Sequence, residues 1–328
     1  MSVLVVGGAG YIGSHTVREL VKAGREPVVF DDLRKGHRDA IGDVPFVSGD
    51  LHDSETLKEA ILEHGIDGVI HFAAFIEVGE SMRDPQKYYW NNVAGSLNLL
   101  RVMRETGVGR LIFSSTAAVY GEPEEIPISE DAAMQPTSVY GRTKMIVELA
   151  LADFATAYGL RYAALRYFNV AGADPSGDIG EDHDPETHLI PLIIKTLMGQ
   201  RAKFSLFGTD YPTRDGTCIR DYVHVTDLAR AHLLALEWLE KNDQCRIYNL
   251  GNGEGFSNRE IIETAERVTG KTLKMVEEAR RPGDPAQLVA SSQKIKDELG
   301  WKPEYDSLDT IIETAWRWHT SHPTGYAR

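Results

Sequence analysis

Length, composition and charge limit what this chain is. Its 328 residues are 42% hydrophobic and 26% charged, which is ordinary for a globular protein of one large domain or two. The formal net charge of -14 argues against a nucleic-acid partner, because phosphate backbones need a basic face. No apolar run approaches the roughly 20 residues of a membrane span. Cys218 and Cys245 show neither metal-ligand nor disulfide spacing, so we expect a cytoplasmic protein without a metal.

The first half of the chain alternates predicted strands with predicted helices. Short apolar runs rich in β-branched residues predict strands at residues 3–6, 27–30, 46–48, 68–74, 111–115 and 162–167. Helical spacing of apolar residues predicts helices at residues 12–23, 54–64, 86–106 and 137–158. Continuous apolar strands separated by helices are typical of a parallel sheet covered on both faces. The order therefore predicts a Rossmann-like, doubly wound α/β fold.

The pattern changes after Asn169. Residues 173–186 are rich in Gly, Pro and Asp and predict a long loop, and the later segments lack the alternation of strand and helix. We therefore divide the chain into a dinucleotide-binding domain, residues 1–169, and a smaller C-terminal α/β substrate lobe, residues 170–328. The segment 221–239 is expected to return to the first domain.

The stretch GGAGYIG, Gly7 to Gly13, lies between a predicted strand and a predicted helix. Its glycines allow a tight turn close to a pyrophosphate, and the helix N-terminus stabilises the anion. Asp31 follows at the end of the next strand, where a carboxylate bonds the adenosine ribose and repels a 2′-phosphate. Together these signals predict NAD rather than NADP; a glycine turn kept for packing is the alternative. Asp50 is either an adenine contact or a turn carboxylate.

Tyr140 and Lys144 in the stretch YGRTK share one face of a predicted helix. A tyrosine has a pKa of about 10 and is a poor base at neutral pH. A lysine ammonium and an oxidised nicotinamide both carry positive charge that lowers the tyrosine pKa. The pair predicts a tyrosine that serves as a general base, and a surface Tyr–Lys pair is the alternative.

Three hydroxyls and two alanines follow a buried strand in LIFSSTAAVYG, Leu111 to Gly121. Serine and threonine often close a strand by bonding nearby backbone groups. With the glycine turn and the YxxxK pair, however, this SST cluster resembles the extended short-chain dehydrogenase/reductase superfamily. Segments over nearly the whole chain are similar to its UDP-glucose 4-epimerase family: HFAAFIEVGES, YYWNNVAGS, LRYFNVAGADPSG, GEDHDPETHLIP, YPTRDGTCIRDYVHV, YNLGNG and RRPGDP.

The resemblance implies interconversion of UDP-galactose and UDP-glucose with a firmly held NAD. It also implies a homodimer that pairs through the helices at residues 86–106 and 137–158. Two alternatives remain open. The first is a 4-epimerase of another UDP-sugar, N-acetylated or a pentose, and the second is an NAD-binding module without catalysis.

The family's catalytic roles fall on three residues of this chain. The resemblance implies that Tyr140 takes the proton of the sugar 4-hydroxyl, that Lys144 tunes Tyr140 and bonds the nicotinamide ribose, and that Thr116 bonds the 4-oxygen. Related dehydratases have Asp and Glu where this chain has Ala117 and Ala118. Alanines transfer no protons, so the resemblance implies epimerisation without elimination of water. Packing beneath the site is the alternative role for both alanines.

Matching motifs imply further contacts. Those to NAD come from Gly7, Gly10, Tyr11, Ile12, Asp31, Asp50, Leu51, Phe72, Ala73, Asn91, Tyr140, Lys144 and Phe168. Those to the UDP-sugar come from Thr116, Tyr140, Asn169, His188, Leu189, Arg220, Arg281 and Asp284. Arginine binds a pyrophosphate bidentately, which reconciles an acidic chain with an anionic substrate; a surface ion pair is the alternative for each arginine. Asn91 and Phe168 are equally open to structural roles, in local hydrogen bonding and in the core.

Four other positions qualify the resemblance. We assign Arg280 to a surface ion pair and His224 to capping or packing. Ile76 stands where some members of the family have a lysine that reaches the cofactor. Leu288 stands at the position that gates the space around the sugar 2-substituent, and its intermediate size decides nothing about N-acetylated substrates.

Overall fold

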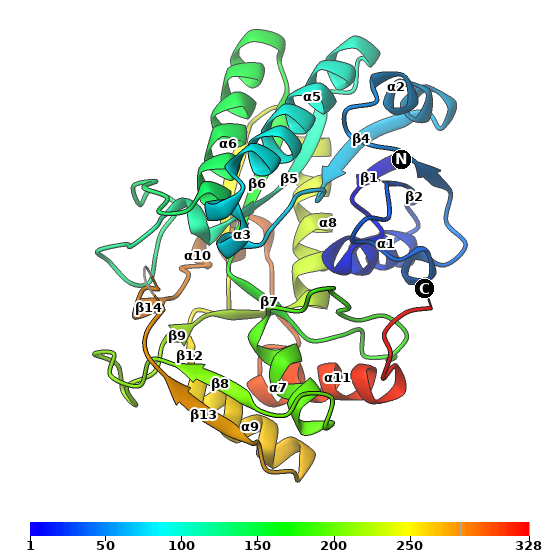
Figure 1. Cartoon of the computed structure of the whole chain (residues 1–328). Coiled ribbons are helices and arrows are strands. Elements are labelled where there is room, and N and C mark those ends of the chain that lie inside the picture. Colours follow the sequence, from blue (N-terminus) through cyan, green and yellow to red (C-terminus); the bar gives the residue numbers. More distant parts are fainter. Residues whose placement is uncertain (282–283, 328) are drawn as a thin grey trace.

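A computed structural model describes residues 1–281 and 284–327 of the chain (Figure 1). Pro282 and Gly283 of the RRPGDP segment lie outside the described residues. Within the described part, seven parallel strands form one sheet in the order β11-β6-β5-β4-β1-β2-β3, which confirms the predicted Rossmann-like fold. The strands of this sheet are β1 Ser2–Val6, β2 Glu26–Asp31, β3 Phe46–Ser48, β4 Ile66–His71, β5 Arg110–Thr116, β6 Arg161–Tyr167 and β11 Arg246–Leu250.

Helices cover both faces of this sheet, because successive side chains of a strand point to opposite sides. Leu4 and Val6 of β1 belong to one core, and Val3 and Val5 belong to the other. The helices that pack into the first core are α2 Ser54–Glu63, α5 Gly95–Thr106 and α6 Val139–Tyr158. Those of the second are α1 Tyr11–Lys22, α8 Val225–Lys241 and α10 Gln293–Leu299.

Segments from late in the chain complete the sheet and its second layer. β11 pairs with β6 in parallel, from Arg246 opposite Ala163 to Leu250 opposite Tyr167. α8 lies beside α1 on the sheet (Figure 1). The sequence analysis did not assign β11 to the sheet, because its five residues have mixed polarity and stand outside the βαβ rhythm. The division of the chain at residue 169 stays a prediction.

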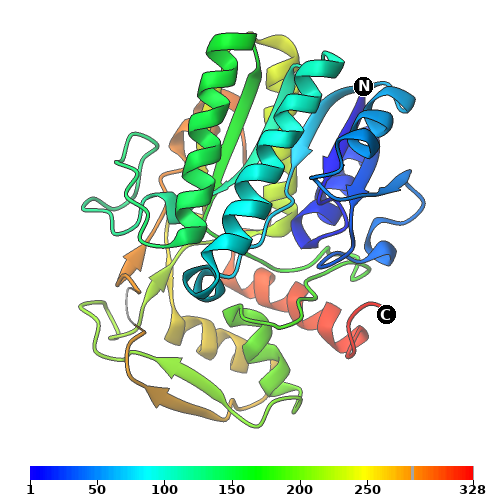
Figure 2. The same cartoon turned by 45° about the horizontal axis from the view of Figure 1, so that its top comes forward.

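The remaining elements lie below the carboxyl ends of the sheet strands in Figures 1 and 2. Three small sheets occur there: β7 Asn169–Ala171 with β10 Tyr222–His224, β9 Ile219–Arg220 with β12 Phe256–Ser257 and β14 Gln287–Leu288, and β8 Phe204–Phe207 with β13 Met275–Glu278. Three helices share a core with β8: α7 Leu189–Leu197, α9 Asn258–Thr269 and α11 Leu308–Ser321. Three short helical segments lie elsewhere in the chain: η1 Arg38–Ile41, α3 Val78–Arg83 and η3 Ala117–Val119.

The helix predicted at residues 86–106 is divided into three parts. α4 covers Pro85–Tyr88, a π-helix η2 covers Tyr89–Ala94, and α5 follows. The π-turn widens the helix and places Asn92 in the interior, where its amide bonds both backbone groups of Phe75 at 2.9 Å. Such turns are frequent at functional sites. Here the turn holds the backbone that follows β4 at the carboxyl end of the sheet.

Candidate active site

The glycine turn lies at the topological switch point of the sheet, since β1 pairs with β4 on one side and with β2 on the other. Gly7 has a φ of 78°, and a Cβ there would lie 2.5 Å from the backbone nitrogen of Ala73. A Cβ on Gly10 would meet, among the described residues, the Gly7 carbonyl oxygen alone, at 3.4 Å. The turn is thus packed against Ala73 on the side of Gly7, and it leaves space on the side of Gly10, at the N-terminus of α1. These residues fit a dinucleotide pyrophosphate.

Asp31 is anchored beside this turn. Its two carboxylate oxygens accept hydrogen bonds from the backbone N–H groups of Ala9, at 3.0 Å, and Leu33, at 2.9 Å. Burial raises the pKa of the Asp31 carboxyl, although these two bonds oppose the rise. Each oxygen keeps a second lone pair, so the carboxylate can still accept from a ribose diol.

Arg34 connects two predicted cofactor residues and was missed by the sequence analysis. Its Nη2 lies 3.0 Å from an oxygen of Asp50 and 3.4 Å from the side-chain oxygen of Asn91. Asp50 also accepts from the backbone N–H of His52 at 2.8 Å, so its turn role is present in the structure. A lone arginine after an acidic strand end carries little signal in sequence, because only the fold brings its partners together.

The other predicted cofactor residues flank the same end of the sheet. Phe72 and Ala73 donate their backbone N–H groups to Val6, at 2.8 and 3.1 Å. The Tyr11 hydroxyl donates to the carbonyl of Gly172 at 2.6 Å, which ties the turn to the loop after β7. Two more are packed nearby, the buried Leu51 and the partly buried Ile12.

The start of α6 positions the Tyr–Lys pair. Ser138 caps the helix, since its hydroxyl accepts from the backbone N–H of Gly141 at 3.0 Å. A Cβ on Gly141 would lie 2.4 Å from the carbonyl oxygen of Ala118, so the glycine lets α6 approach η3 closely. Tyr140 and Lys144 therefore point into the interior at the end of β5, with 8% and 3% of their surfaces exposed.

Burial dominates the titration of both groups. It raises the pKa of Tyr140 to about 12, against a smaller lowering by a hydrogen bond with Thr116. It lowers the pKa of Lys144 to about 7, against the opposing charge of Glu148. The Lys144 ammonium donates to the Ser114 carbonyl at 2.7 Å. The expected lowering of the Tyr140 pKa is thus absent from the protein alone, because desolvation outweighs the hydrogen bond with Thr116.

The three hydroxyls at the end of β5 have different partners. The Ser114 hydroxyl bonds that of Tyr167, and the Ser115 hydroxyl donates to the carboxylate of Glu148. The Thr116 hydroxyl accepts from the backbone N–H of Ala118 at 3.1 Å and faces Tyr140. Two hydroxyls therefore hold the strand end in place, and the third remains for the site.

Both alanines after this cluster are packed. Ala118 contacts the cluster of Tyr140 and Val139, and Ala117 is buried with Phe168 and Leu288. The packing role considered for the alanines is therefore present. The same contacts bring together Phe168 and Leu288, which the resemblance placed at the nicotinamide and at the sugar.

Three further predicted residues lie among the small sheets and helices below the carboxyl ends of the sheet strands, a group of elements called here the facing lobe. They are Arg220, Asp284 and Arg281. The guanidinium of Arg220 pairs with Asp284 and donates to the Ile219 carbonyl at 2.8 Å. The pairing of β9 with β14 sets Leu288 opposite Arg220. Arg281 stacks over the ring of Phe207 at 4.0 Å. The side chains of Arg220 and Asp284 are 12% and 34% exposed, so this pair is accessible from solvent.

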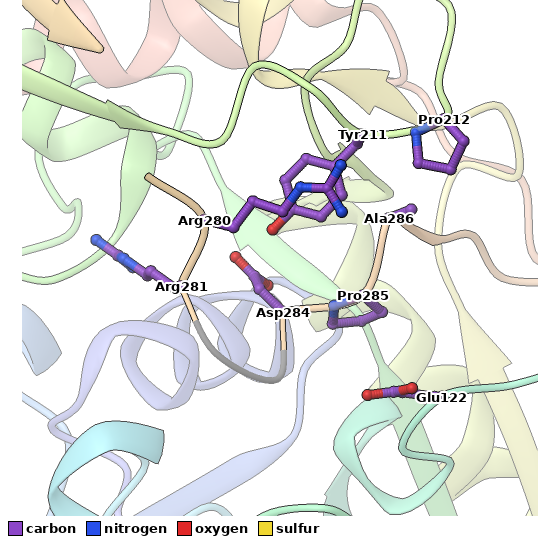
Figure 3. Close-up of a pocket in the computed structure, with 8 residues that line it drawn as sticks. All are labelled: Glu122, Tyr211, Pro212, Arg280, Arg281, Asp284, Pro285 and Ala286. Atoms are coloured by element: carbon purple, nitrogen blue, oxygen red, sulfur yellow. The ribbon is translucent and has the colours of Figure 1, made fainter. Parts of the chain in front are cut away.

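A cleft of about 490 Å³ opens at this arginine end of the site (Figure 3). It is lined by Glu122, Tyr211, Pro212, Arg280, Arg281, Asp284, Pro285 and Ala286. Arg280 lies over the ring of Tyr211 at 4.2 Å and pairs with Asp210 at 2.7 Å, whereas Arg281 points to the opposite side. The surface ion pair predicted for Arg280 is confirmed.

The remaining predicted contacts have local partners. Asn169 donates its side-chain amide to the Asp221 carbonyl at 3.1 Å. His188 stands at the N-cap position of α7, just before Leu189, but its side chain does not bond the helix; instead its Nδ1 lies 2.5 Å from the carboxylate of Glu181. His224 accepts from the backbone N–H of Thr226 at 3.1 Å, which confirms its capping role. Ile76 is 40% exposed.

The fold and this site define an NAD-binding α/β enzyme with a Thr/Tyr/Lys set at the carboxyl ends of its strands. The chain belongs to the NAD dependent epimerase/dehydratase family, whose model matches residues 3–251. Among the described helices, none has both the length and the apolar character that crossing a membrane requires.

Three known proteins are similar to this chain over nearly its full length. A UDP-glucose 4-epimerase of Halalkalibacterium halodurans is 53% identical over 327 residues, which cover 100% of this chain and 98% of the relative. A crystal structure of a UDP-glucose 4-epimerase, 52% identical, superposes with a TM-score of 0.98 over 100% of both chains. The Bifidobacterium longum UDP-glucose 4-epimerase, solved with NAD⁺ and UDP, is 37% identical with a TM-score of 0.94, over 99% of this chain and 100% of that one.

Proposed function

We propose that this chain is a UDP-glucose 4-epimerase that interconverts UDP-galactose and UDP-glucose with NAD as its cofactor. One observation carries the proposal. The Tyr140 hydroxyl bonds Thr116 inside the protein, and Tyr140 lies one helical turn before Lys144. The two residues that follow Thr116 in the chain are alanines. Relatives of this name at about half identity over the whole chain support it.

Bound NAD supplies the hydride acceptor for the sugar C4 and, while oxidised, a positive charge near Tyr140. The turn at Gly7 and Gly10 would hold its pyrophosphate, and Asp31 would hold its adenosine ribose. Lys144 would bond the nicotinamide ribose with the N–H donors that Ser114 leaves free.

Tyr140 would act as the base at the sugar 4-hydroxyl. In the free protein burial raises its pKa to about 12, so its hydroxyl is protonated. The positive charge of bound, oxidised NAD would lower this pKa, so that Tyr140 releases its proton to solvent and the phenolate can then accept the proton of the 4-hydroxyl. Thr116 would accept and donate at the 4-oxygen while the proton moves to Tyr140. When hydride returns to the other face of the sugar, Tyr140 would give the proton back, so the enzyme ends unchanged.

The alanines limit the reaction to epimerisation. Elimination of water from the oxidised sugar needs an acid and a base beside the ring. Ala117 and Ala118 occupy the positions that follow Thr116 and carry no titratable group. The oxidised sugar would therefore persist until hydride returns.

The facing lobe would hold the UDP portion. Arg220 and Arg281 each offer a planar set of N–H donors that suits a pyrophosphate. Asp284 would bond the uridine ribose, and Asn169, His188 and Leu189 would complete the contacts to the sugar nucleotide. Arg220 keeps donors beyond those used by Asp284 and Ile219, so it can add a phosphate without losing both partners.

Proton NMR of the purified protein with UDP-galactose, without added cofactor, tests the proposal. Growth of the anomeric signal of UDP-glucose to a stable mixture, without net nicotinamide reduction, would support the epimerase and a retained NAD. If no conversion occurs even after NAD is added, the proposal fails for this substrate. The same sample then receives UDP-N-acetylglucosamine, to test the related substrate class.

We also propose a homodimer that forms through η2, α5 and α6. Trp90, Leu97 and Leu149 lie on these helices with 63%, 40% and 52% of their surfaces exposed, and a second copy would cover them. Light scattering should give twice the chain mass, and Leu149→Lys should shift it towards the monomer. Leu62→Lys is the control, because Leu62 is 60% exposed on α2. A monomer at working concentration would contradict the proposal.

We place the protein in the cytoplasm, where its free cysteines would stay reduced.

A further inference from the structure

Four side chains with metal-binding atoms meet in the loop between β7 and α7. They are Glu181, His183, Glu186 and His188, and their nearest carboxylate oxygens and imidazole nitrogens all lie within 4.8 Å of one another. The proposed function uses one of them, His188. The cysteines of the chain predicted no metal site, and this cluster contains none of them. The spacing E-x-H-x-x-E-x-H was visible in the sequence, but only the fold of the loop directs the four side chains to one point.

Hydrogen bonds within the protein account for part of this cluster. His188 Nδ1 lies 2.5 Å from a Glu181 oxygen, and one Glu186 oxygen accepts from the backbone N–H groups of Thr187 and His188 at 2.7 and 2.8 Å. Glu186 Oε2, however, is buried without a hydrogen-bond partner, and His183 Nδ1 makes no hydrogen bond of good geometry, although it lies at ion-pair distance from Glu181. The Glu186 side chain is only 5% exposed, and this oxygen lies 4.0 Å from His183 Nδ1. Buried polar atoms normally have partners, so the Glu186 oxygen that points into the cluster is left unsatisfied by the protein.

A cation at the centre would serve this oxygen and offset the charge of two buried carboxylates. We propose that Glu181, His183, Glu186 and His188 bind one divalent transition-metal ion of the Zn²⁺ type. Two imidazoles with two carboxylates suit such an ion, whereas Mg²⁺ and Ca²⁺ prefer oxygen ligands alone and Cu(I) prefers sulfur.

The distances lie near those of this class of ion. Zn–N and Zn–O bonds of about 2.0–2.2 Å place neighbouring tetrahedral ligand atoms roughly 3.3–3.5 Å apart. The Nδ1 of His183 lies 3.2 Å from Glu181 and 4.0 Å from Glu186, and the Nδ1 of His188 lies 3.8 Å from Glu186. The separations in the cluster run from 2.5 Å, between His188 and Glu181, to at most 4.8 Å, so a tetrahedral site would require changes of roughly 1 to 1.5 Å in these distances.

The surroundings indicate a structural ion rather than a catalytic one. With four protein ligands no position remains open for water or substrate. Next to the cluster, Asp182 accepts from the backbone N–H of Tyr326 at 3.0 Å, and the Tyr11 ring lies edge-on to that of His183 at 6.2 Å. The ion would thus fix the loop between the glycine turn and α7. If His188 contacts substrate as proposed above, the ion would also orient its ring through Nδ1.

Co²⁺ is the probe, because it replaces Zn²⁺ and reports its coordination in the visible spectrum. The full-length protein is stripped with a chelator, dialysed and titrated with Co²⁺. We expect one Co²⁺ per chain with the intense d–d bands of a tetrahedral ion, and a raised unfolding temperature. Glu186→Gln and His183→Gln should each weaken binding at least tenfold. His64→Gln and Glu63→Gln, at the end of α2, are matched controls and should bind as the wild type does.

Wild-type protein that binds less than a tenth of an equivalent, or that shows only octahedral Co²⁺, would overturn the proposal. So would variants of the cluster that bind as tightly as the controls. If the variants do not fold, X-ray absorption of the Zn²⁺-loaded wild type decides the matter. It must show four nitrogen or oxygen neighbours with the scattering of two imidazoles. Because these readouts do not depend on epimerase activity, they separate this proposal from the proposed function.

Discussion

Two arginine–carboxylate pairs belong to different parts of the protein and differ in burial. Arg166 and Glu148, between β6 and α6, are each 3% exposed, whereas Arg220 and Asp284 on the facing lobe are 12% and 34% exposed. The first pair cannot exchange partners without leaving a buried charge. The second is open to solvent and can accept a new anion. The comparison shows that the interior of the site is held rigidly and that its rim is left adaptable.

The buried pair belongs to a complete network. Arg166 donates to both oxygens of Glu148, to the Tyr120 hydroxyl at 2.9 Å and to the Glu130 carbonyl at 3.2 Å. Glu148 in turn accepts from the Ser115 hydroxyl. This network fixes the end of β5 against α6. It therefore sets the position of Thr116, the residue after Ser115, which faces Tyr140. A fully satisfied buried network of this kind rigidifies its surroundings.

The largest effect is expected inside the rigid part. Tyr140→Phe removes the group proposed to accept the proton, and loss of a general base costs on the order of 10²- to 10⁴-fold in kcat. Turnover of UDP-galactose measures it, with the circular dichroism spectrum showing that the fold is kept. Tyr158→Phe, 56% exposed in the same helix, is the control. Full activity of Tyr140→Phe would remove Tyr140 from the mechanism.

Glu148→Gln tests the rigidity itself. It leaves Arg166 buried without its counter-charge, which costs about 3–5 kcal/mol of the free energy of unfolding. Urea denaturation at a fixed NAD concentration measures the loss. Asp243→Asn breaks the surface pair with Arg161, in which the aspartate is 92% exposed, and should cost less than about 1 kcal/mol. Equal losses in the two variants would mean that burial does not distinguish these pairs.

Arg220→Ala tests the adaptable rim. Hydrogen bonds to charged groups contribute about 1.5–3 kcal/mol, so KM for the UDP-sugar should rise on the order of 10- to 100-fold. Because Arg220 is proposed to bind the nucleotide and not the reacting sugar, kcat should change little. Arg259→Ala, which loses a surface pair with Glu277, is the control in the same lobe. A fall in kcat at constant KM would contradict the assignment.

The smallest effect is a pH dependence of stability that burial imposes. Burial, assisted by the charge of Lys144, lowers the pKa of His71 to about 3. Between about pH 6.5 and 3 the unfolded chain therefore binds a proton that the folded chain does not, so stability falls as the pH falls, by up to about 1.4 kcal/mol per pH unit. His71→Asn should reduce the slope of the unfolding free energy between pH 6.5 and 5 by up to about 1.4 kcal/mol per pH unit, and other buried histidines such as His224 keep the remaining slope. His64→Asn should keep the wild-type slope, and an unchanged slope in His71→Asn would refute the assignment.

Local patterns in the sequence determined most strands of the sheet, the class of cofactor and the reactive pair of residues. The apolar runs predicted six strands of the sheet, because continuous burial on both faces leaves a composition signal in each strand. The glycine turn with Asp31, and the spacing of Tyr140 and Lys144, predicted the cofactor class and the reactive pair, because these groups act over a few neighbouring residues. The family resemblance supplied the reaction, which no composition or spacing establishes.

The tertiary structure decided what depends on distant neighbours. It placed β11 in the sheet and joined Asp50 to Asn91 through Arg34. It assigned two of the three hydroxyls at the end of β5 to structural bonds, and it raised the pKa of Tyr140 where charge alone predicted a fall. Desolvation and side-chain convergence are properties of the packed interior, and a sequence does not state which groups will share that interior.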